Sequence, residues 1–196
     1  MWSRLAQIIG FGNPRFTRPD GPVRPKLLVT TGCVDGLNAC LAPEQRKGHE
    51  GIAYLFGRTD GMVTLAVTAF RPKAKTTPGS FLVEPRAMAR GVRAAADLGL
   101  QIVAQVHTHP GAAYHSDGDI EGARIRYAGY ASIVLPEYGR HLPRFDGAAV
   151  YISDKTDQWI ELSSKEVVVI SERVPWTRSN GGGNATTARS GMREDV

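Results

Sequence analysis

The stretch that decides the fold reads QIVAQVHTHP and runs from Gln101 to Pro110. Its first six residues are mostly apolar and compatible with an extended chain, which predicts a strand. Side chains two positions apart on a strand point the same way, so His107 and His109 share one face. Pro110 then ends the strand, because it has no N–H to donate to a sheet ladder. The pattern predicts a strand that presents two imidazoles together.

A carboxylate follows after a short loop, in the sequence SDGD. Ser116 is a favourable N-cap residue, which puts Asp119 at the N3 position of a helix, facing back toward the histidines. Two neutral imidazoles and a third ligand form the three-residue set that leaves a catalytic zinc one open position for water. His107, His109 and Asp119 are therefore candidate metal ligands, with Asp117 as the alternative carboxylate.

These residues resemble the JAMM (MPN+/JAB) metalloprotease motif, in which His-x-His is followed by a short loop and Ser-x-x-Asp, with a Glu far upstream. The loop between His109 and Ser116 holds six residues, one fewer than is usual in that family. Glu50 directly precedes residues 51–57, GIAYLFG, which look like the family's Glu-bearing segment and its following strand. Residues 129–136, GYASIVLP, resemble the next core strand of bacterial JAB proteins. The likeness covers about residues 26 to 170.

The resemblance implies a zinc-dependent, deubiquitinase-like isopeptidase or peptidase. Such an enzyme hydrolyses the amide bond after the C-terminal Gly of a ubiquitin-like modifier, in deconjugation or precursor processing. It implies Zn²⁺ held by His107, His109 and Asp119, with Glu50 as catalytic acid and base. Ser116 would donate a hydrogen bond to the oxyanion of the tetrahedral intermediate. The implied partners are the modifier, its conjugates, and E1-like and E2-like proteins.

The resemblance also implies a fold of the α/β (α+β) class, with an MPN/JAB-like mixed β-sheet flanked by helices in a cytidine-deaminase-like layout. Taken alone, a ligand set of two His and one Asp also suits iron, cobalt or manganese. His49-Glu50 is not followed by a second His at the required spacing, which excludes a thermolysin-type zinc helix.

Other interpretations of these residues stay open. A strand histidine is more often a packing residue than a ligand, and Ser116 with Asp119 can serve only as a helix cap. Glu44, Glu84 and Glu121 are equally available carboxylates, so only the resemblance selects Glu50. The alternative functions are a catalytically inactive MPN scaffold or binding module, and a JAMM hydrolase acting on a sulfur-carrier protein adduct.

Charge and cysteine content restrict the partners and the location. The formal charge of +5 comes from Lys and Arg spread along the chain, so we expect no nucleic-acid partner. Arg71, Lys73 and Lys75 form the densest basic cluster, which suits an acidic protein partner. Cys33 and Cys40 are spaced too widely on a predicted helix to form a disulfide, as is typical of a cytosolic protein. The sequence shows no signal peptide and no membrane-spanning stretch, so we expect a cytoplasmic location.

One domain is predicted between two irregular ends. Residues 1–25 are predicted to form an irregular leader, 26–175 the metalloprotease domain, and 176–196 a disordered tail. Strands are expected at 26–30, 51–56, 62–70, 101–106, 131–135 and 148–152, with late strands or a closing helix at 159–162 and 167–170. Helices are expected at 34–47 and 85–98. Residues 71–83 hold two prolines and a glycine and are expected to form a long loop.

Overall fold

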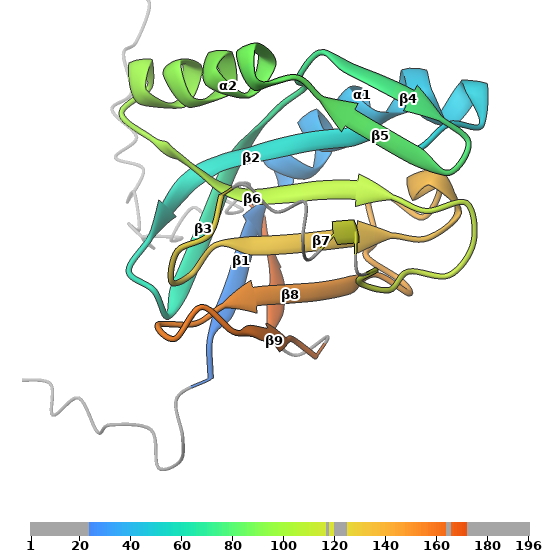
Figure 1. Cartoon of the computed structure of the whole chain (residues 1–196). Helices are drawn as coiled ribbons and strands as arrows, with labels where there is room; N and C mark the ends of the chain where they lie inside the picture. Colours follow the sequence, from blue (N-terminus) through green and yellow to red (C-terminus); the bar gives the residue numbers. More distant parts are fainter. Residues whose placement is uncertain (1–23, 117, 120–124, 164–165, 172–196) are drawn as a thin grey trace, which may run out of the picture.

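The computed structural model describes residues 24–116, 118–119, 125–163 and 166–171. Within these residues, an eight-stranded mixed sheet has the strand order β10-β1-β3-β2-β6-β7-β8-β9 (Figure 1). The pairs β1–β3, β1–β10 and β6–β7 are parallel, and the other neighbours are antiparallel. The strands of this sheet are β1 (Lys26–Thr30), β2 (Ile52–Thr59), β3 (Val63–Phe70), β6 (Gln101–Thr108), β7 (Ala131–Leu135), β8 (Ala149–Ser153), β9 (Trp159–Glu161) and β10 (Val167–Ile170). The predicted mixed α/β class is confirmed.

In the part of the chain that the structure describes, two helices cover the sheet, one on each face: α1 (Thr31–Lys47) and α2 (Pro85–Asp97). Alternating side chains of β2 show the division, because Ala53 and Leu55 pack into the core beneath α1, whereas Tyr54 and Phe56 pack into the core beneath α2. Since both faces of the central strands are buried, β2 and β6 are apolar along most of their length rather than alternating with polar residues.

Helix α1 begins three residues earlier than the sequence predicted. The Thr30 hydroxyl accepts a hydrogen bond from the N–H of Cys33 at 3.2 Å, which makes Thr30 the N-cap. The helix ends at Gly48, whose φ of 66° lies in the left-handed region that glycine tolerates best. Helix α2 begins with Pro85, as predicted. Cys33 and Cys40 both lie on α1 and form no disulfide, in agreement with the prediction.

The predicted long loop over residues 71–83 is wrong. The chain forms a two-stranded hairpin there, β4 (Ala74–Thr77) and β5 (Ser80–Val83), which is a separate small sheet. Pro78 and Gly79 form its turn, and Thr, Phe, Leu and Val supply its strands. The prolines that argued for a loop stand before β4 and in the turn, where a missing N–H breaks no ladder.

A close approach of two strands requires Gly57. A Cβ atom at this position would overlap the carbonyl oxygen of Leu65 on β3, at a point where the register between β2 and β3 shifts. Glycine is the residue that permits such a bulge.

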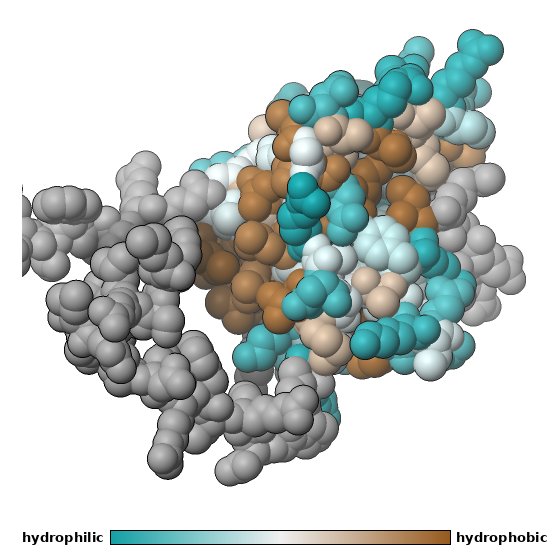
Figure 2. Space-filling model, turned by 90° about the vertical axis from the view of Figure 1, so that its left-hand side faces the viewer, coloured by the Kyte–Doolittle hydropathy of each residue, from teal (hydrophilic) through white to brown (hydrophobic). Residues whose placement is uncertain are grey.

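The two ends of the sheet differ. Strand β6 points toward the end that carries the histidines (Figure 1). At the other end, hydrophobic residues reach the surface among hydrophilic ones (Figure 2). No helix among the described residues has the length and apolar composition needed to cross a membrane. The predicted leader and tail lie almost wholly outside the described residues.

Candidate metal centre

Strand β6 delivers both histidines to one place, as predicted. His107 is fully buried and His109 is 8% exposed. Their ring centroids lie 5.1 Å apart. His109 stays attached to the sheet beyond the end of β6, because its N–H donates to the carbonyl of Leu135 on β7 at 2.9 Å. The i, i+2 spacing on an extended chain therefore places the two rings side by side.

Asp119 joins the histidines through a local capping arrangement with Ser116. The Ser116 N–H and hydroxyl both donate to Oδ2 of Asp119, at 2.9 and 2.6 Å, and the N–H of Asp119 lies 3.2 Å from the Ser116 Oγ that accepts it. This reciprocal bonding is the capping box expected of an N-cap and an N3 residue. This bonding leaves Oδ1 of Asp119 facing His107, at 3.0 Å from Nε2 of that ring. Nε2 of His109 lies 3.7 Å from Oδ2 of Asp119.

The three side chains fit a divalent metal. Each of them offers one ligand atom, and these atoms all lie within 4.8 Å of one another. Despite the short contact with Asp119, neither ring nitrogen of His107 makes a hydrogen bond of good geometry among the described residues. A fully buried imidazole without such a bond is costly unless something else takes its lone pair. A shared cation would supply that partner, and the three side chains are those of the predicted ligand set.

The electrostatics also favour a cation. Burial opposes charge on Asp119, but the adjacent His107 and the hydrogen bonds from Ser116 outweigh burial and hold the pKa of Asp119 well below its usual value. Burial and the neighbouring His107 lower the pKa of His109. The site therefore offers an ionised carboxylate and a neutral imidazole near pH 7, which are the protonation states that metal binding requires.

Glu50 lies two residues before β2, beside the histidine strand. The neighbouring residue Ile52 pairs with His107 in the antiparallel ladder, which fixes the position of the segment along β6. Gly51 is held by Thr108 through two hydrogen bonds, from the Gly51 N–H to the Thr108 hydroxyl at 2.8 Å and from the Thr108 N–H to the Gly51 carbonyl at 3.1 Å. On the other side, the Glu50 N–H donates to the carbonyl of Thr77 on the hairpin at 2.8 Å.

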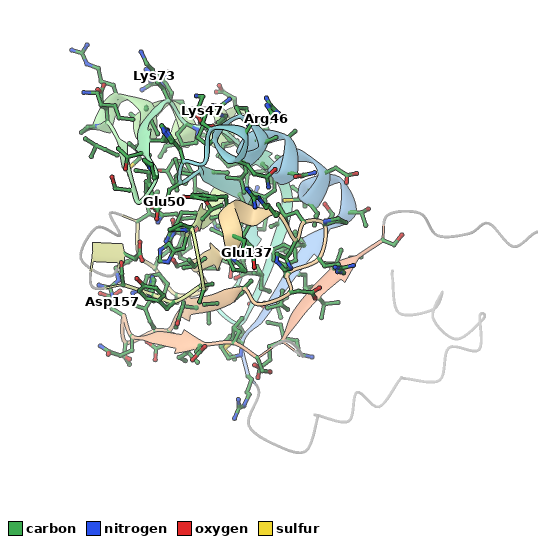
Figure 3. All side chains as sticks on the ribbon, turned by 90° about the vertical axis from the view of Figure 1, so that its right-hand side faces the viewer. Arg46, Lys47, Glu50, Lys73, Glu137 and Asp157 are labelled. Carbon is green, nitrogen blue, oxygen red and sulfur yellow. The ribbon has the colours of Figure 1, made fainter. Side chains whose placement is uncertain are left out.

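The environment of Glu50 suits proton transfer. The residue is 6% exposed, and burial raises the pKa of its carboxyl group, with His107 opposing the shift and Asp119 adding to it. A carboxylate of raised pKa exchanges protons more readily near neutral pH. Figure 3 views the molecule from this end and shows Glu50 between the hairpin and the strands below it.

Glu50, His109 and Asp119 open into one groove of about 750 Å³. One wall is the hairpin with α2, and the other is the loop after β6. Phe81 of the hairpin lies 5.2 Å from the His107 ring, and Tyr114 of the loop contacts the His109 ring edge-on at 4.8 Å. The remaining residues of the groove are Tyr54, Gly79, Ser80, Leu82, Val83, Met88, Gln105, Pro110, Gly111, Ala112, Ser116 and Gly118.

Comparison with known proteins agrees with this site. The family model for prokaryotic homologues of the JAB domain matches residues 40–155, a range that contains every candidate ligand and Glu50. The chain belongs to this JAB family. A protein named probable metalloprotease y4jG, from Sinorhizobium fredii, is 31% identical over 136 residues, which are 67% of this chain and 84% of that protein. The solution structure of protein DSY2949 from Desulfitobacterium hafniense has a similar fold, with a TM-score of 0.55 and 18% identity over 74% of this chain and 94% of that one. Family, relative and ligand cluster together support a metal-dependent hydrolase.

In this JAB domain the shortened loop between His109 and Ser116 is anchored by His115. The His115 ring stacks on Tyr151 of β8, with centroids 4.4 Å apart, and meets Trp159 of β9 edge-on at 5.1 Å. The six-residue loop therefore closes without displacing the capping box. His115 does not line the groove, and neither do His49 and His141. The alternative ligand Asp117 lies outside the described residues.

A second support of the JAB site comes from the 3₁₀ turn η1 (Glu137–Gly139), which follows β7. The N–H of Tyr138 donates to the His109 carbonyl at 2.8 Å, its carbonyl accepts from Gln45 of α1 at 3.3 Å, and its hydroxyl donates to the Pro78 carbonyl at the hairpin tip at 3.1 Å. Glu137 and Tyr138 both have positive φ, 49° and 57°, which costs energy in residues other than glycine. The strained turn ties the histidine strand to the hairpin.

Sequence reasoning missed Phe81, Tyr138 and Thr108. The Pro78-Gly79 turn between β-forming residues was a usable signal for the hairpin that carries Phe81. No local pattern marks Tyr138, because its partners are far away in the sequence. Thr108 was counted only as the residue between two histidines, although a hydroxyl on the opposite face of that strand must find its own partner.

Proposed function

We propose that this protein is a zinc-dependent isopeptidase or peptidase that hydrolyses the amide bond after the C-terminal Gly of a ubiquitin-like modifier. One observation carries the proposal. Glu50, a buried carboxylate of raised pKa, lines the same groove as His109 and Asp119 of the metal-ligand cluster. The named relative, a probable metalloprotease, supports peptide-bond chemistry.

In this mechanism His107, His109 and Asp119 hold the metal. When bound, a zinc ion supplies a Lewis acid that acidifies a water molecule toward a pKa of about 7. Glu50 accepts the proton from the attacking water and then gives it to the leaving amine, so one carboxylate serves as base and then as acid. Burial raises the pKa of Glu50, which favours its acceptance of that proton.

Ser116 has two roles in the proposal. In the structure its hydroxyl donates to Asp119 and so orients a ligand. The same hydroxyl lines the groove and would have to exchange that bond to stabilise the oxyanion of the tetrahedral intermediate. Ser116→Ala separates these roles, since losing the orientation lowers metal affinity and losing the oxyanion contact lowers kcat at saturating metal.

The proposed substrate approaches as an extended chain. Strand β5 pairs only with β4 in the described sheet, so its other edge is free to receive a further strand beside the groove. Gly79, Gly111 and Gly118 line the groove with little bulk. A narrow, extended C-terminal tail fits such walls better than a folded surface does.

The first experiment measures metal content by elemental mass spectrometry, with wild type beside His107→Ala/His109→Ala. We expect about one zinc per chain in the wild type and none in the double variant. Gly-terminated modifier fusions are then incubated with wild type and Glu50→Gln, and the products are identified by mass. Cleavage after the terminal Gly by wild type alone supports the proposal.

Two outcomes would contradict it. Absence of metal, with none taken up from added zinc, would favour a scaffold that has lost catalysis. Full turnover by a zinc-loaded Glu50→Gln variant would remove Glu50 from its role. A different metal at full occupancy would correct only the identity of the ion.

A further inference from the structure

A second cavity lies beside the hairpin, away from the groove. It has a volume of about 300 Å³ and we call it the basic pocket. Strand β4 lines this pocket and β5 lines the groove, so the hairpin stands between the two cavities. The residues of the basic pocket are Glu44, Ile52, Arg71, Pro72, Lys73, Ala74 and Thr76.

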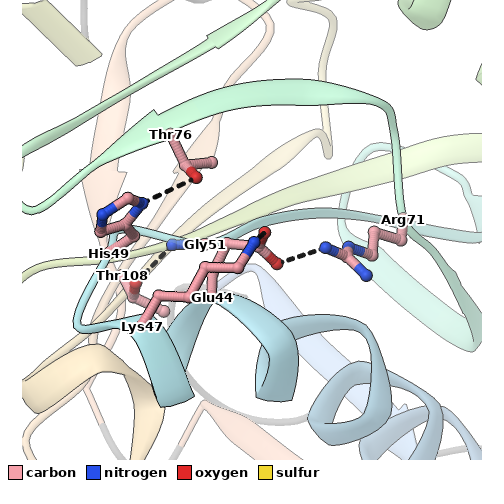
Figure 4. A network of polar contacts seen from close by, with 7 residues as sticks. All are labelled: Glu44, Lys47, His49, Gly51, Arg71, Thr76 and Thr108. Carbon is pink, nitrogen blue, oxygen red and sulfur yellow. Dashed lines mark hydrogen bonds and ion pairs between the residues drawn. The ribbon is translucent and has the colours of Figure 1, made fainter.

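One carboxylate in the basic pocket is shared by two cations. Glu44 is 7% exposed and contacts the guanidinium of Arg71 at 2.6 Å and the ammonium of Lys47 at 3.3 Å (Figure 4). The side chains of Arg71 and Lys47 are 43% and 58% exposed. A single carboxylate neutralises only one of these charges. The guanidinium also keeps donors that Glu44 does not use.

Two further cations at this end of the molecule lack local neutralisation, and one of them, Lys73, lines the basic pocket. Lys73 and Arg46 are exposed and have no carboxylate partner among the described residues. Figure 3 views the end of the molecule that carries Glu50 and shows Lys73, Arg46 and Lys47 along one side of it. Arg46 complements the C-terminal end of α1, a favourable place for a cation. No such local reason applies to Lys73, so the pocket has excess positive charge facing solvent.

We propose that the basic pocket binds an acidic segment of the protein substrate, an inference that rests on the proposed function. Ile52, Pro72 and Ala74 offer apolar contact to the methylene groups of an Asp or Glu side chain, and Arg71 and Lys73 meet its carboxylate. Because the pocket and the groove flank the same two-stranded hairpin, one substrate can contact both, with an extended segment that advances about 3.5 Å per residue passing between them.

The pocket fits a protein better than a nucleic acid. None of the described residues that line it is aromatic, so they offer no surface on which a base could stack. Attraction of an acidic segment would also speed the encounter with a basic protein of pI near 9.4.

The test measures binding without hydrolysis. A fluorescein-labelled peptide rich in Asp and Glu, and a matched peptide with Asn and Gln in their place, are titrated with the full chain by fluorescence anisotropy. We expect the acidic peptide alone to bind, with affinity falling between about 50 and 200 mM salt. Lys73→Glu should weaken binding about five-fold or more, as a favourable charge contact becomes a repulsive one. Arg93→Glu, an exposed position on α2, makes the same change in net charge and should alter binding by less than about two-fold.

Several results would overturn the inference. Equal losses in Lys73→Glu and Arg93→Glu would mean that only net charge matters. Equal binding of the neutral peptide would remove the acidic preference. Tighter binding of a short DNA duplex, lost in Lys73→Glu, would make the pocket a nucleic-acid contact. None of these results bears on the proposed hydrolysis, because the assay needs neither metal nor turnover. Conversely, a protein that binds the acidic peptide but cleaves no substrate would contradict the proposed function and leave the acidic-segment site standing.

Discussion

Replacing Thr108 by Val keeps the volume of the side chain and removes one acceptor oxygen. The Thr108 hydroxyl accepts a hydrogen bond of 2.8 Å from the N–H of Gly51, and both residues are buried. Without that acceptor, a buried N–H is left unsatisfied at a cost of about 1–3 kcal/mol. For a domain of this size, that cost corresponds to a fall in Tm of roughly 3–9 °C.

The same bond positions Glu50, which precedes Gly51. We expect Thr108→Val to lower kcat about ten-fold or more, because small displacements of a catalytic group cost rate steeply. KM and metal content should change little, and Thr108→Ser should restore kcat by returning the hydroxyl. The assay combines thermal unfolding, metal analysis and steady-state cleavage of a Gly-terminated modifier fusion.

Thr64→Val is the matched control. Thr64 is also fully buried, and its hydroxyl donates to the Gly129 carbonyl at 2.5 Å, far along the sheet from the histidines. It should lose comparable stability while kcat stays near the wild-type value. If Thr108→Val lowers kcat no more than Thr64→Val does, the bond to Gly51 does not position Glu50 and the reasoning is refuted.

Two further predictions concern the hairpin and the histidines. Tyr138→Phe removes the hydroxyl that donates to the carbonyl of Pro78. Amide hydrogen exchange in residues 74–83 should therefore quicken, and KM should rise about two- to ten-fold with metal content unchanged. Unaltered exchange would show that the hydroxyl does not hold the hairpin. Burial lowers the pKa of His109 below its unfolded value of about 6.5, so the unfolded chain binds this proton more readily. The contribution of His109 to the stability of the metal-free protein is therefore complete above about pH 6.5 and is lost as the pH falls. Urea unfolding between about pH 7.5 and 5.5 should show that decline in wild type and less of it in His109→Gln; equal declines would assign the effect to other groups.

Local sequence patterns predicted much of the site. The alternation of strand side chains placed His107 and His109 together, and the spacing of Ser116 and Asp119 predicted the capping box that the structure shows. Glu50 was different, because nothing in its local sequence distinguishes it from other acids. Only the resemblance to a known family selected it.

What the sequence by itself determined is the set of features that depend on neighbours a few residues apart: the helices and the strands outside the hairpin, the two histidines on one face, the cap, and the family. What only the tertiary structure decided depends on pairing across long stretches of chain. The register of β2 against β6 pairs Ile52 with His107 and so brings Glu50 close to the histidines. The hairpin wall and the Tyr138 contacts join segments up to 93 residues apart. The physical reason is that backbone hydrogen bonds carry no sequence label, so register and long-range contacts are selected by the packing of the whole core rather than by any local pattern.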